Sequence, residues 1–273
     1  MTAAISTAPD SPQAIGSLVR TWRERRRRSQ LDLALAADVS ARHLSFIETG
    51  RSRPSRAMIE RLCDELDVPL RERNTLYLAA GFAPVHPERP ITDLGAAHDA
   101  IQAVLTGHEP NPAMAVNVRW ELLAANRAAL GFLQQVPAAL LEPPVNVLRL
   151  TLHPDGLSGR ILNLHEWRSH VLRRVRRQLD RTAAVGLADL LAELSSYPDG
   201  KPDPAAPEAE VSDASGIVTP MRLATEAGDL ALLYTTTLFG SPHDVTLDEV
   251  AVETFFPADA ATGRALRALA GRD

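Results

Sequence analysis

Residues 29–55 constrain the fold of this chain more than any other stretch, because they read as two short helices joined by a tight turn and followed by a basic loop. Serine is among the preferred residues at helix N-caps, and three serines precede helical patterns here: Ser29, Ser40 and Ser55. With the flanking apolar periodicity, these signals predict five short helices. We therefore expect an all-α domain over residues 13–82.

A helix-turn-helix places its second helix in the major groove of DNA. Since a helix turns by about 100° per residue, Leu44 and Ile47 face the core together. The opposite side of the same helix then carries four side chains, which we expect to contact base edges: Ala41, Arg42, Ser45 and Phe46. Arg42 can donate to both acceptors of a guanine, whereas Ala41 and Phe46 suit the methyl group of thymine.

Three further side chains are expected to contact phosphates: Gln30 at the start of the first helix of the motif, and Arg51 and Arg53 in the loop after the second. The arginine run 25–28 is either a phosphate-binding strip or, as we favour, a solvated helix end. A helical hairpin with a solvated charged face is the alternative to a DNA-binding motif. The coincidence of caps, turn, inward pair and basic loop in one register argues against that alternative.

Residues 15–80 resemble the XRE family of Cro/C1-type helix-turn-helix regulators, in the pattern SQ…LA…A-DVS…LS-IE-GR-RPS. The resemblance implies that Gln30 binds a phosphate. It also implies that bases are read from Ala41, Arg42 and Phe46. A structural pair between Arg23 of the first helix and Glu48 of the third is a further implication of the resemblance.

Charge is divided unevenly along the chain. Residues 1–84 carry 13 Arg against 10 Asp and Glu, whereas the whole chain has a net charge of −5. A basic segment beside an acidic one indicates nucleic acid as the partner of the first. The single cysteine, Cys63, excludes an internal disulfide, and no apolar run reaches the roughly 18 residues that span a bilayer. The first residues lack the features of a signal peptide, so we expect a cytoplasmic protein without membrane contact.

The rest of the chain mixes helical and strand patterns. We interpret residues 1–12 as disordered, 83–110 as a linker with a connecting helix, and 111–273 as a second domain. Residues 164–182 predict a long helix, 146–152 are extended or helical, and 197–212 predict an exposed loop. Strands are predicted at 113–118, 120–125, 217–224, 229–239 and 249–256. Strands on both sides of helices predict an α+β domain with an antiparallel sheet.

Residues 111–270 resemble the MmyB-like ligand-binding domain, a PAS-like module, in segments such as AVNVRWELLAANRAA and NLHEWRSHVLRRVRRQL. The resemblance implies a pocket for an apolar small molecule such as a fatty acid. The residues expected to line it are Trp120, Leu122, Phe132, Trp167, Leu223, Leu232, Tyr234, Phe239 and Phe255. Each of them could instead simply fill a core. The arginines of the long helix form a solvated face or, alternatively, bind a carboxylate or a second copy of the chain.

Metal and catalytic interpretations fail on spacing. His165, Glu166 and His170 come close to the zinc-binding pattern HExxH, but the histidines are five residues apart instead of four. That spacing turns the two rings about 140° apart on a helix. The chain also lacks a glycine-rich phosphate-binding loop. We therefore expect no metal site, no catalytic site, no cofactor and no enzymatic activity.

Together these features predict a homodimeric repressor that binds a roughly palindromic operator in double-stranded DNA and responds to an apolar small molecule. In the alternative, the second domain only dimerises or docks a protein partner and binds no small molecule.

Overall fold

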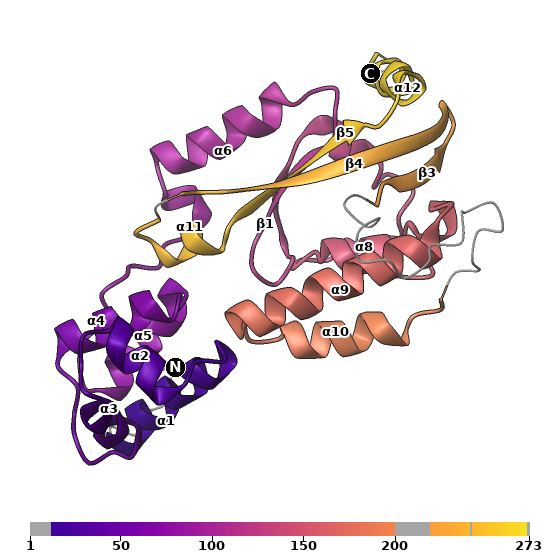
Figure 1. The fold of residues 1–273 in the computed structure, drawn as a ribbon. Helices are drawn as coiled ribbons and strands as arrows, with labels where there is room; N and C mark the ends of the chain where they lie inside the picture. The colour runs from indigo at the N-terminus through magenta and orange to yellow at the C-terminus, as the bar shows by residue number, and fades with distance from the viewer. Residues whose placement is uncertain (1–11, 200–218, 241, 272–273) are drawn as a thin grey trace, which may run out of the picture. The chain divides into compact units, whose positions relative to one another are not determined.

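The computed structural model describes residues 12–199, 219–240 and 242–271 (Figure 1). The start that we expected to be disordered lies almost entirely outside the described residues, as does most of the loop expected at 197–212. The chain divides into two compact units: Met1–Arg89 with Ser241–Asp248, and Pro90–Gly240 with Glu249–Asp273. A short segment before the last strand therefore belongs to the first unit and interrupts the second in sequence.

The first unit contains the five helices that the sequence predicts: α1 Pro12–Arg25, α2 Gln30–Ala36, α3 Ala41–Glu48, α4 Arg56–Glu65 and α5 Leu70–Ala79. The three serine caps are confirmed, because the Ser29, Ser40 and Ser55 hydroxyls accept from backbone N–H groups one turn into α2, α3 and α4. Asp32 returns a hydrogen bond to the Ser29 N–H, which completes a capping box. Local capping thus sets where these helices begin.

Gly16 allows α1 to pack against the end of α3. A Cβ atom at this position would lie 2.3 Å from the Ile47 carbonyl oxygen and 2.7 Å from that of Glu48. Both atoms belong to the backbone and cannot move aside cheaply. Glycine at position 16 therefore fixes how closely the two helices approach, which places Glu48 next to α1.

The segment before the last strand holds an element that the sequence pattern did not predict. Helix α11 occupies Val245–Glu249, where we expected the chain to lead directly into a strand. Asp244 accepts from the Thr246 N–H and pairs with Arg89 at 2.9 Å, and the Asp248 carboxylate accepts from the Leu70 N–H at the start of α5. These contacts explain why the segment is part of the first unit.

The second unit is built on a five-stranded antiparallel sheet of order β2-β1-β5-β4-β3, as the α+β prediction requires. Its strands are β1 Ala113–Val116, β2 Leu122–Ala125, β3 Met221–Thr225, β4 Gly228–Leu238 and β5 Ala251–Pro257. Strands β3 and β4 form the predicted hairpin, with Gly228 at φ 109° where glycine is favoured. Strand β5 lies at the centre of the sheet, and its residues Val252, Glu253 and Thr254 are buried.

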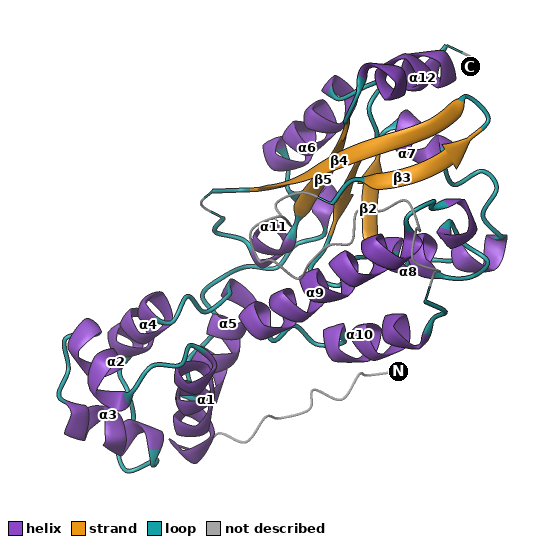
Figure 2. Cartoon of the chain, turned by 45° about the vertical axis from the view of Figure 1, so that its right-hand side comes forward, coloured by secondary structure: helices purple, strands orange, loops and turns teal. Residues whose placement is uncertain are grey.

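Helices cover both faces of this sheet. Helix α6 (Ala96–Gly107) packs on one face, where Ile101 and Leu105 meet β1 and β5. On the other face lie α8 (Val147–Leu152), α9 (Leu164–Thr182) and α10 (Leu187–Ser196) (Figures 1 and 2). Residues 146–152, for which the sequence allows an extended or a helical conformation, contain helix α8, and the Asn146 side chain caps it. The remaining elements are α7 Arg127–Gly131, α12 Ala260–Ala270, η1 Ile91–Asp93, η2 Ala138–Leu140 and η3 Ser158–Arg160.

Candidate DNA-binding surface and ligand cavity

Helix α3 buries one side and presents the other, as its spacing predicts. Leu44 and Ile47 are fully buried, whereas Arg42 is exposed. Ala41, Ser45 and Phe46 are partly exposed on the remaining surface of the helix. The four expected base-reading residues are thus all reachable from outside the first unit.

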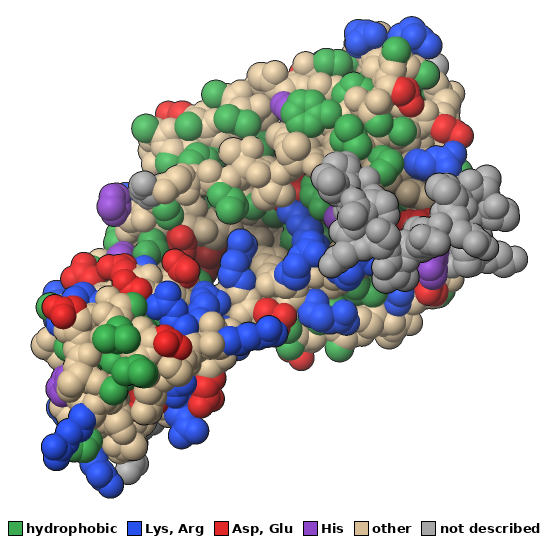
Figure 3. Space-filling view, viewed as in Figure 1, with side chains coloured by type: hydrophobic (Ala, Val, Ile, Leu, Met, Phe, Trp, Pro, Cys, Tyr) green, Lys and Arg blue, Asp and Glu red, His purple; other side chains and the backbone are tan. Residues whose placement is uncertain are grey.

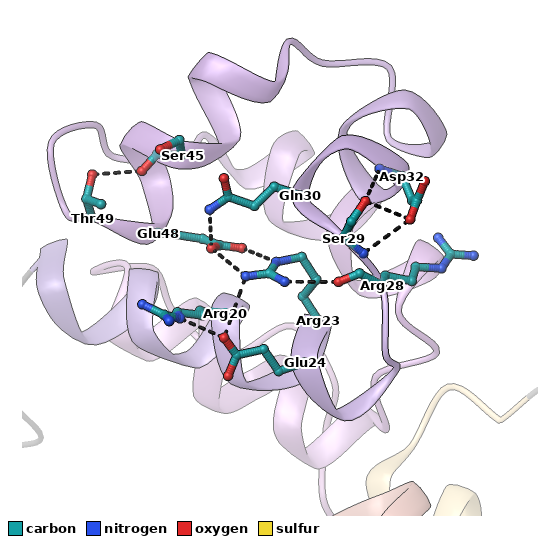
Figure 4. Close-up of polar contacts among 10 residues, drawn as sticks. All are labelled: Arg20, Arg23, Glu24, Arg28, Ser29, Gln30, Asp32, Ser45, Glu48 and Thr49. Carbon is teal, nitrogen blue, oxygen red and sulfur yellow. Dashed lines mark hydrogen bonds and ion pairs between the residues drawn. The ribbon is translucent and has the colours of Figure 1, made fainter.

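A buried hydrogen-bond network holds α3 against α1 and α2 (Figure 4). The Arg23 guanidinium donates to both carboxylate oxygens of Glu48, at 2.7 and 2.9 Å. Gln30 Nε2 donates to the same carboxylate at 2.7 Å, and Arg23 also donates to the Arg28 carbonyl oxygen. Hydrogen bonding to Glu48 raises the pKa of Arg23. The pair expected between Arg23 and Glu48 is confirmed, and Gln30, expected to contact a phosphate, also joins this network.

Basic side chains lie near α3 at the surface of the first unit (Figure 3). The Arg42 guanidinium lies over the Phe46 ring, 5.3 Å from its centroid, which is within the range of a cation–π interaction. Arg51 and Arg53 are exposed in the loop that follows. Gly50, at φ 71°, ends α3 and turns the chain into that loop.

The arginine run 25–28 divides into different roles. Arg26 donates to the Leu66 and Asp67 carbonyl oxygens at the end of α4, and Arg28 pairs with Glu65 at 3.1 Å. Arg26 also lies 5.1 Å from the centroid of the Trp22 ring. These two arginines therefore tie α1 to α4, while Arg27 is exposed.

A cavity of about 100 Å³ lies in the second unit, between the sheet and the helices on the α9 side. The structure brings eight of the nine expected residues to its wall: Trp120, Leu122, Phe132, Trp167, Leu223, Leu232, Tyr234 and Phe255. Phe239 does not line it. Because Phe239 follows the end of β4, it packs instead with Ile101, Val250 and Val252, on the face that α6 covers. The wall of the cavity is predominantly apolar, as small-molecule sites commonly are.

One end of the cavity is an aromatic and imidazole cluster. The His170 ring stacks on Trp167, with centroids 5.5 Å apart, and its Nε2 hydrogen-bonds the Tyr234 hydroxyl. Tyr234 also meets Trp167 edge-on at 5.6 Å and contacts Phe255. Burial and the nearby arginines lower the pKa of His170 to about 4, and burial raises the pKa of Tyr234. Both groups are therefore uncharged at neutral pH.

An ion pair adjoins this cluster. Arg174 donates to both carboxylate oxygens of Glu253, at 2.9 and 2.6 Å, and the Glu253 side chain is only 4% exposed. The Arg174 guanidinium also lies over the Trp120 and Tyr234 rings, 4.5 and 4.8 Å from their centroids. Trp120 is held in turn by Gln178, which accepts from its Nε1 at 2.7 Å. Arg174 is thus neither part of a solvated face nor free to bind a second carboxylate.

Sequence reasoning missed three ionisable residues of the cavity wall, which are His170, Arg174 and Glu253. Helical spacing could have found the first two, because they lie three and seven residues after Trp167 and share its face of α9. Glu253 also left a signal, since it is the only charged residue of the otherwise apolar β5 segment AVETFFP. His165, also on α9, hydrogen-bonds Asp199.

Among residues 12–199, 219–240 and 242–271, no group of three His, Cys, Asp or Glu side chains is arranged to hold a metal ion. Within the same described ranges, no helix is both long and apolar enough to cross a membrane.

Two family profiles match the chain, one for each unit. Residues 14–76 match a helix-turn-helix domain, and residues 97–269 match the MmyB-like transcription regulator ligand binding domain. The second match alone covers more than half of the chain. The chain belongs to the MmyB-like transcription regulators. It is accordingly a helix-turn-helix, DNA-binding transcription regulator with a C-terminal domain of a ligand-binding type.

Solved structures are similar to this MmyB-like regulator over a quarter of the chain or over nearly all of it. The clp gene regulator ClgR from C. glutamicum is 30% identical over 26% of this chain and 88% of that chain, with a TM-score of 0.23. The restriction-modification controller protein C.AhdI from Aeromonas hydrophila is 26% identical over 23% and 94%, with a TM-score of 0.22. An RNA-binding Light-Oxygen-Voltage receptor is 12% identical over 96% and 63%, with a TM-score of 0.30. No significant match is found among curated proteins.

Proposed function

We propose that this MmyB-like regulator is a cytoplasmic, homodimeric repressor that binds a roughly palindromic operator and releases it when an apolar small molecule enters the second unit. The observation that carries the DNA-binding half is the outward face of α3, with Arg42 exposed and held over Phe46. The cavity behind Trp120 and Trp167 supports the effector half.

Operator reading falls to the exposed side of α3. Arg42 donates to a guanine, Ala41 and Phe46 meet thymine methyl groups, and Ser45 adds a hydrogen bond. Gln30, Arg51 and Arg53 contact phosphates, which position the protein without reading sequence. Two copies would place their α3 helices about 34 Å apart, one helical turn of DNA. Such a dimer reads two half-sites of opposite orientation.

Effector binding acts on the population of dimer states. A ligand that binds one of two dimer states more tightly shifts the population toward that state. The size of the shift is set by the difference between its affinities for the two states. An apolar molecule suits the cavity because its wall is predominantly apolar. A fatty acid is one member of this ligand class.

Operator binding can be tested by footprinting and by fluorescence anisotropy on the operator and on unrelated DNA. Arg42→Ala should weaken operator binding about 10- to 100-fold, because one bidentate base contact contributes about 1–3 kcal/mol of discrimination. The same variant should bind unrelated DNA nearly as wild type does. Arg51→Ala should weaken both complexes by similar factors, and Arg264→Ala, exposed on α12, should weaken neither.

Equal losses on both DNAs would remove Arg42 from the base-reading set. A footprint without any preferred sequence would overturn the operator-binding proposal altogether. Deleting the gene should raise expression of the regulated promoter if the protein represses it, and a fall in expression would contradict that direction.

A further inference from the structure

We propose that the cavity of the second unit binds an uncharged apolar molecule carrying one hydrogen-bond acceptor, such as a ketone, aldehyde or ester, and discriminates against an ionised fatty acid. The inference rests on the proposed function, since it names the class of effector for the same cavity. It is carried by the way in which the polar groups of the cavity wall are already paired.

Arg174, the only cation of the described cavity wall, already forms an ion pair with Glu253. Arg174 gives two hydrogen bonds to Glu253 and a third, at 2.6 Å, to the Thr236 hydroxyl. Its guanidinium also lies over the Trp120 and Tyr234 rings. A ligand carboxylate would have to break a bidentate ion pair to reach this arginine.

The anion of that pair also lines the cavity. Glu253 is buried at the centre of the sheet, and besides its two bonds from Arg174 it accepts a hydrogen bond from the Thr236 hydroxyl at 3.0 Å. A ligand carboxylate bound here would bring a second negative charge beside Glu253, while Arg174, the only cation among the described wall residues, already pairs with that glutamate. Burying an unpaired charge is strongly unfavourable, so the wall discriminates against anionic headgroups.

His170 does not supply the missing positive charge. It is enclosed between Trp167 and Tyr234, and Arg173, Arg174 and Arg177 lie near enough to disfavour its protonation. The described wall thus holds one cation and one anion that neutralise each other, and its other members are uncharged.

Hydrogen-bond donors remain for a neutral acceptor. Trp167 lines the cavity, is 6% exposed, and its Nε1–H is buried without an acceptor among the described residues. The Tyr234 hydroxyl and His170 share one hydrogen bond, so one of them can turn a donor elsewhere. A carbonyl or ester oxygen would satisfy these donors, whereas a hydrocarbon would not. The volume of about 100 Å³ suits a short chain, since an apolar cavity of about 150 Å³ holds benzene.

Two short probes of equal chain length test the inference on the wild-type protein: 2-butanone, and butanoic acid, which is ionised at pH 7.5. Isothermal titration calorimetry and thermal shift should show the ketone binding at least tenfold more tightly than butanoate. Equal or tighter binding of butanoate would overturn the inference and leave the apolar effector proposal standing. Binding of neither probe would overturn both the inference and the apolar effector proposal, and would leave the operator-binding proposal untouched.

A substitution that removes the negative charge of the Arg174–Glu253 pair gives a second, more specific test. Glu253→Gln removes the anion and leaves Arg174 as a net cation at the cavity, so butanoate affinity should rise at least tenfold while ketone affinity changes little. Glu193→Gln is the matched control, because Glu193 forms a bidentate pair with Arg149 that does not line the cavity. Unchanged discrimination in a folded Glu253→Gln protein would contradict the role assigned to Glu253. The wild-type probe pair decides if that variant does not fold.

Discussion

Each unit of this regulator contains one buried bidentate arginine–glutamate pair, and the two pairs differ in their surroundings. Arg23 and Glu48 are 10% and 2% exposed, and Gln30 adds a hydrogen bond inside a packed helical core. Arg174 and Glu253 are 23% and 4% exposed and lie against an apolar cavity. The two pairs have the same chemistry. The Arg23–Glu48 pair is enclosed by packed side chains, whereas the Arg174–Glu253 pair lies beside the cavity.

This difference indicates that the neighbours of an ion pair decide its role. The pair of the first unit connects α1 with the end of α3 and so fixes the helix that carries Arg42. The pair of the second unit connects α9 with the central strand and sets the charge of a cavity wall. A buried pair is weak evidence for stability by itself, but removing one partner leaves a charge buried and unpaired.

The largest effect is expected from Arg23→Met, which leaves Glu48 buried with only Gln30 as a side-chain donor. Breaking a buried pair in this way costs about 3–5 kcal/mol of unfolding free energy. Hydrogen exchange resolved by peptide should show faster exchange in α1 to α5, with the sheet of the second unit unchanged, and operator binding should be lost.

Arg20→Ala is the control, since Arg20 forms an exposed pair with Glu24 on the same helix. Exposed pairs contribute little, so its exchange pattern should match that of wild type. A similar loss in both variants would show that charge on α1, and not the buried pair, stabilises the first unit.

A smaller loss of stability is expected from Arg174→Met. Arg174 is more exposed than Arg23, and Thr236 still donates to Glu253 after the substitution. We expect a loss of about 2 kcal/mol of unfolding free energy, which is below the range for breaking a fully enclosed pair. Chemical denaturation, followed by hydrogen exchange in β4 and β5, measures it. A loss as large as that of Arg23→Met would remove the distinction between an enclosed pair and one beside a cavity.

The remaining prediction concerns pH. Because the pKa of His170 is lowered from 6.5 to about 4, the unfolded chain takes up this proton at higher pH than the folded one. The contribution of the neutral His170 to folding stability is fully present above about pH 6.5, and it is lost as the pH falls toward 4. Wild-type stability of the second unit should therefore decline over that range more steeply than that of His170→Gln. Parallel curves would show that His170 titrates normally.

Much of the first unit could be predicted because its signals are local. Ser29, Ser40 and Ser55 cap the helices that follow them, and the spacing of Leu44 and Ile47 gives the buried side of α3. The hydrogen bonds that set these helix starts join residues three apart in sequence, so a short window contains their cause.

The second unit was predictable in its sheet class but not in its details. Helix α11 went unrecognised because its position depends on partners far away in sequence, among them Leu70 and Arg89. Phe239 was assigned to the cavity because it is aromatic, although its place just beyond the end of β4 leaves it on the opposite face of the sheet. Which face a residue covers near a strand end depends on register, which neighbouring strands decide.

The sequence by itself determined the helix-turn-helix, its outward face and the apolar character of the second unit, because caps and periodicity are properties of short segments. Only the tertiary structure decided that Arg174 meets Glu253, 79 residues away, and that their charges cancel at the cavity wall. Pairing across that separation depends on the register of β5 and the packing of α9, and no local pattern encodes either.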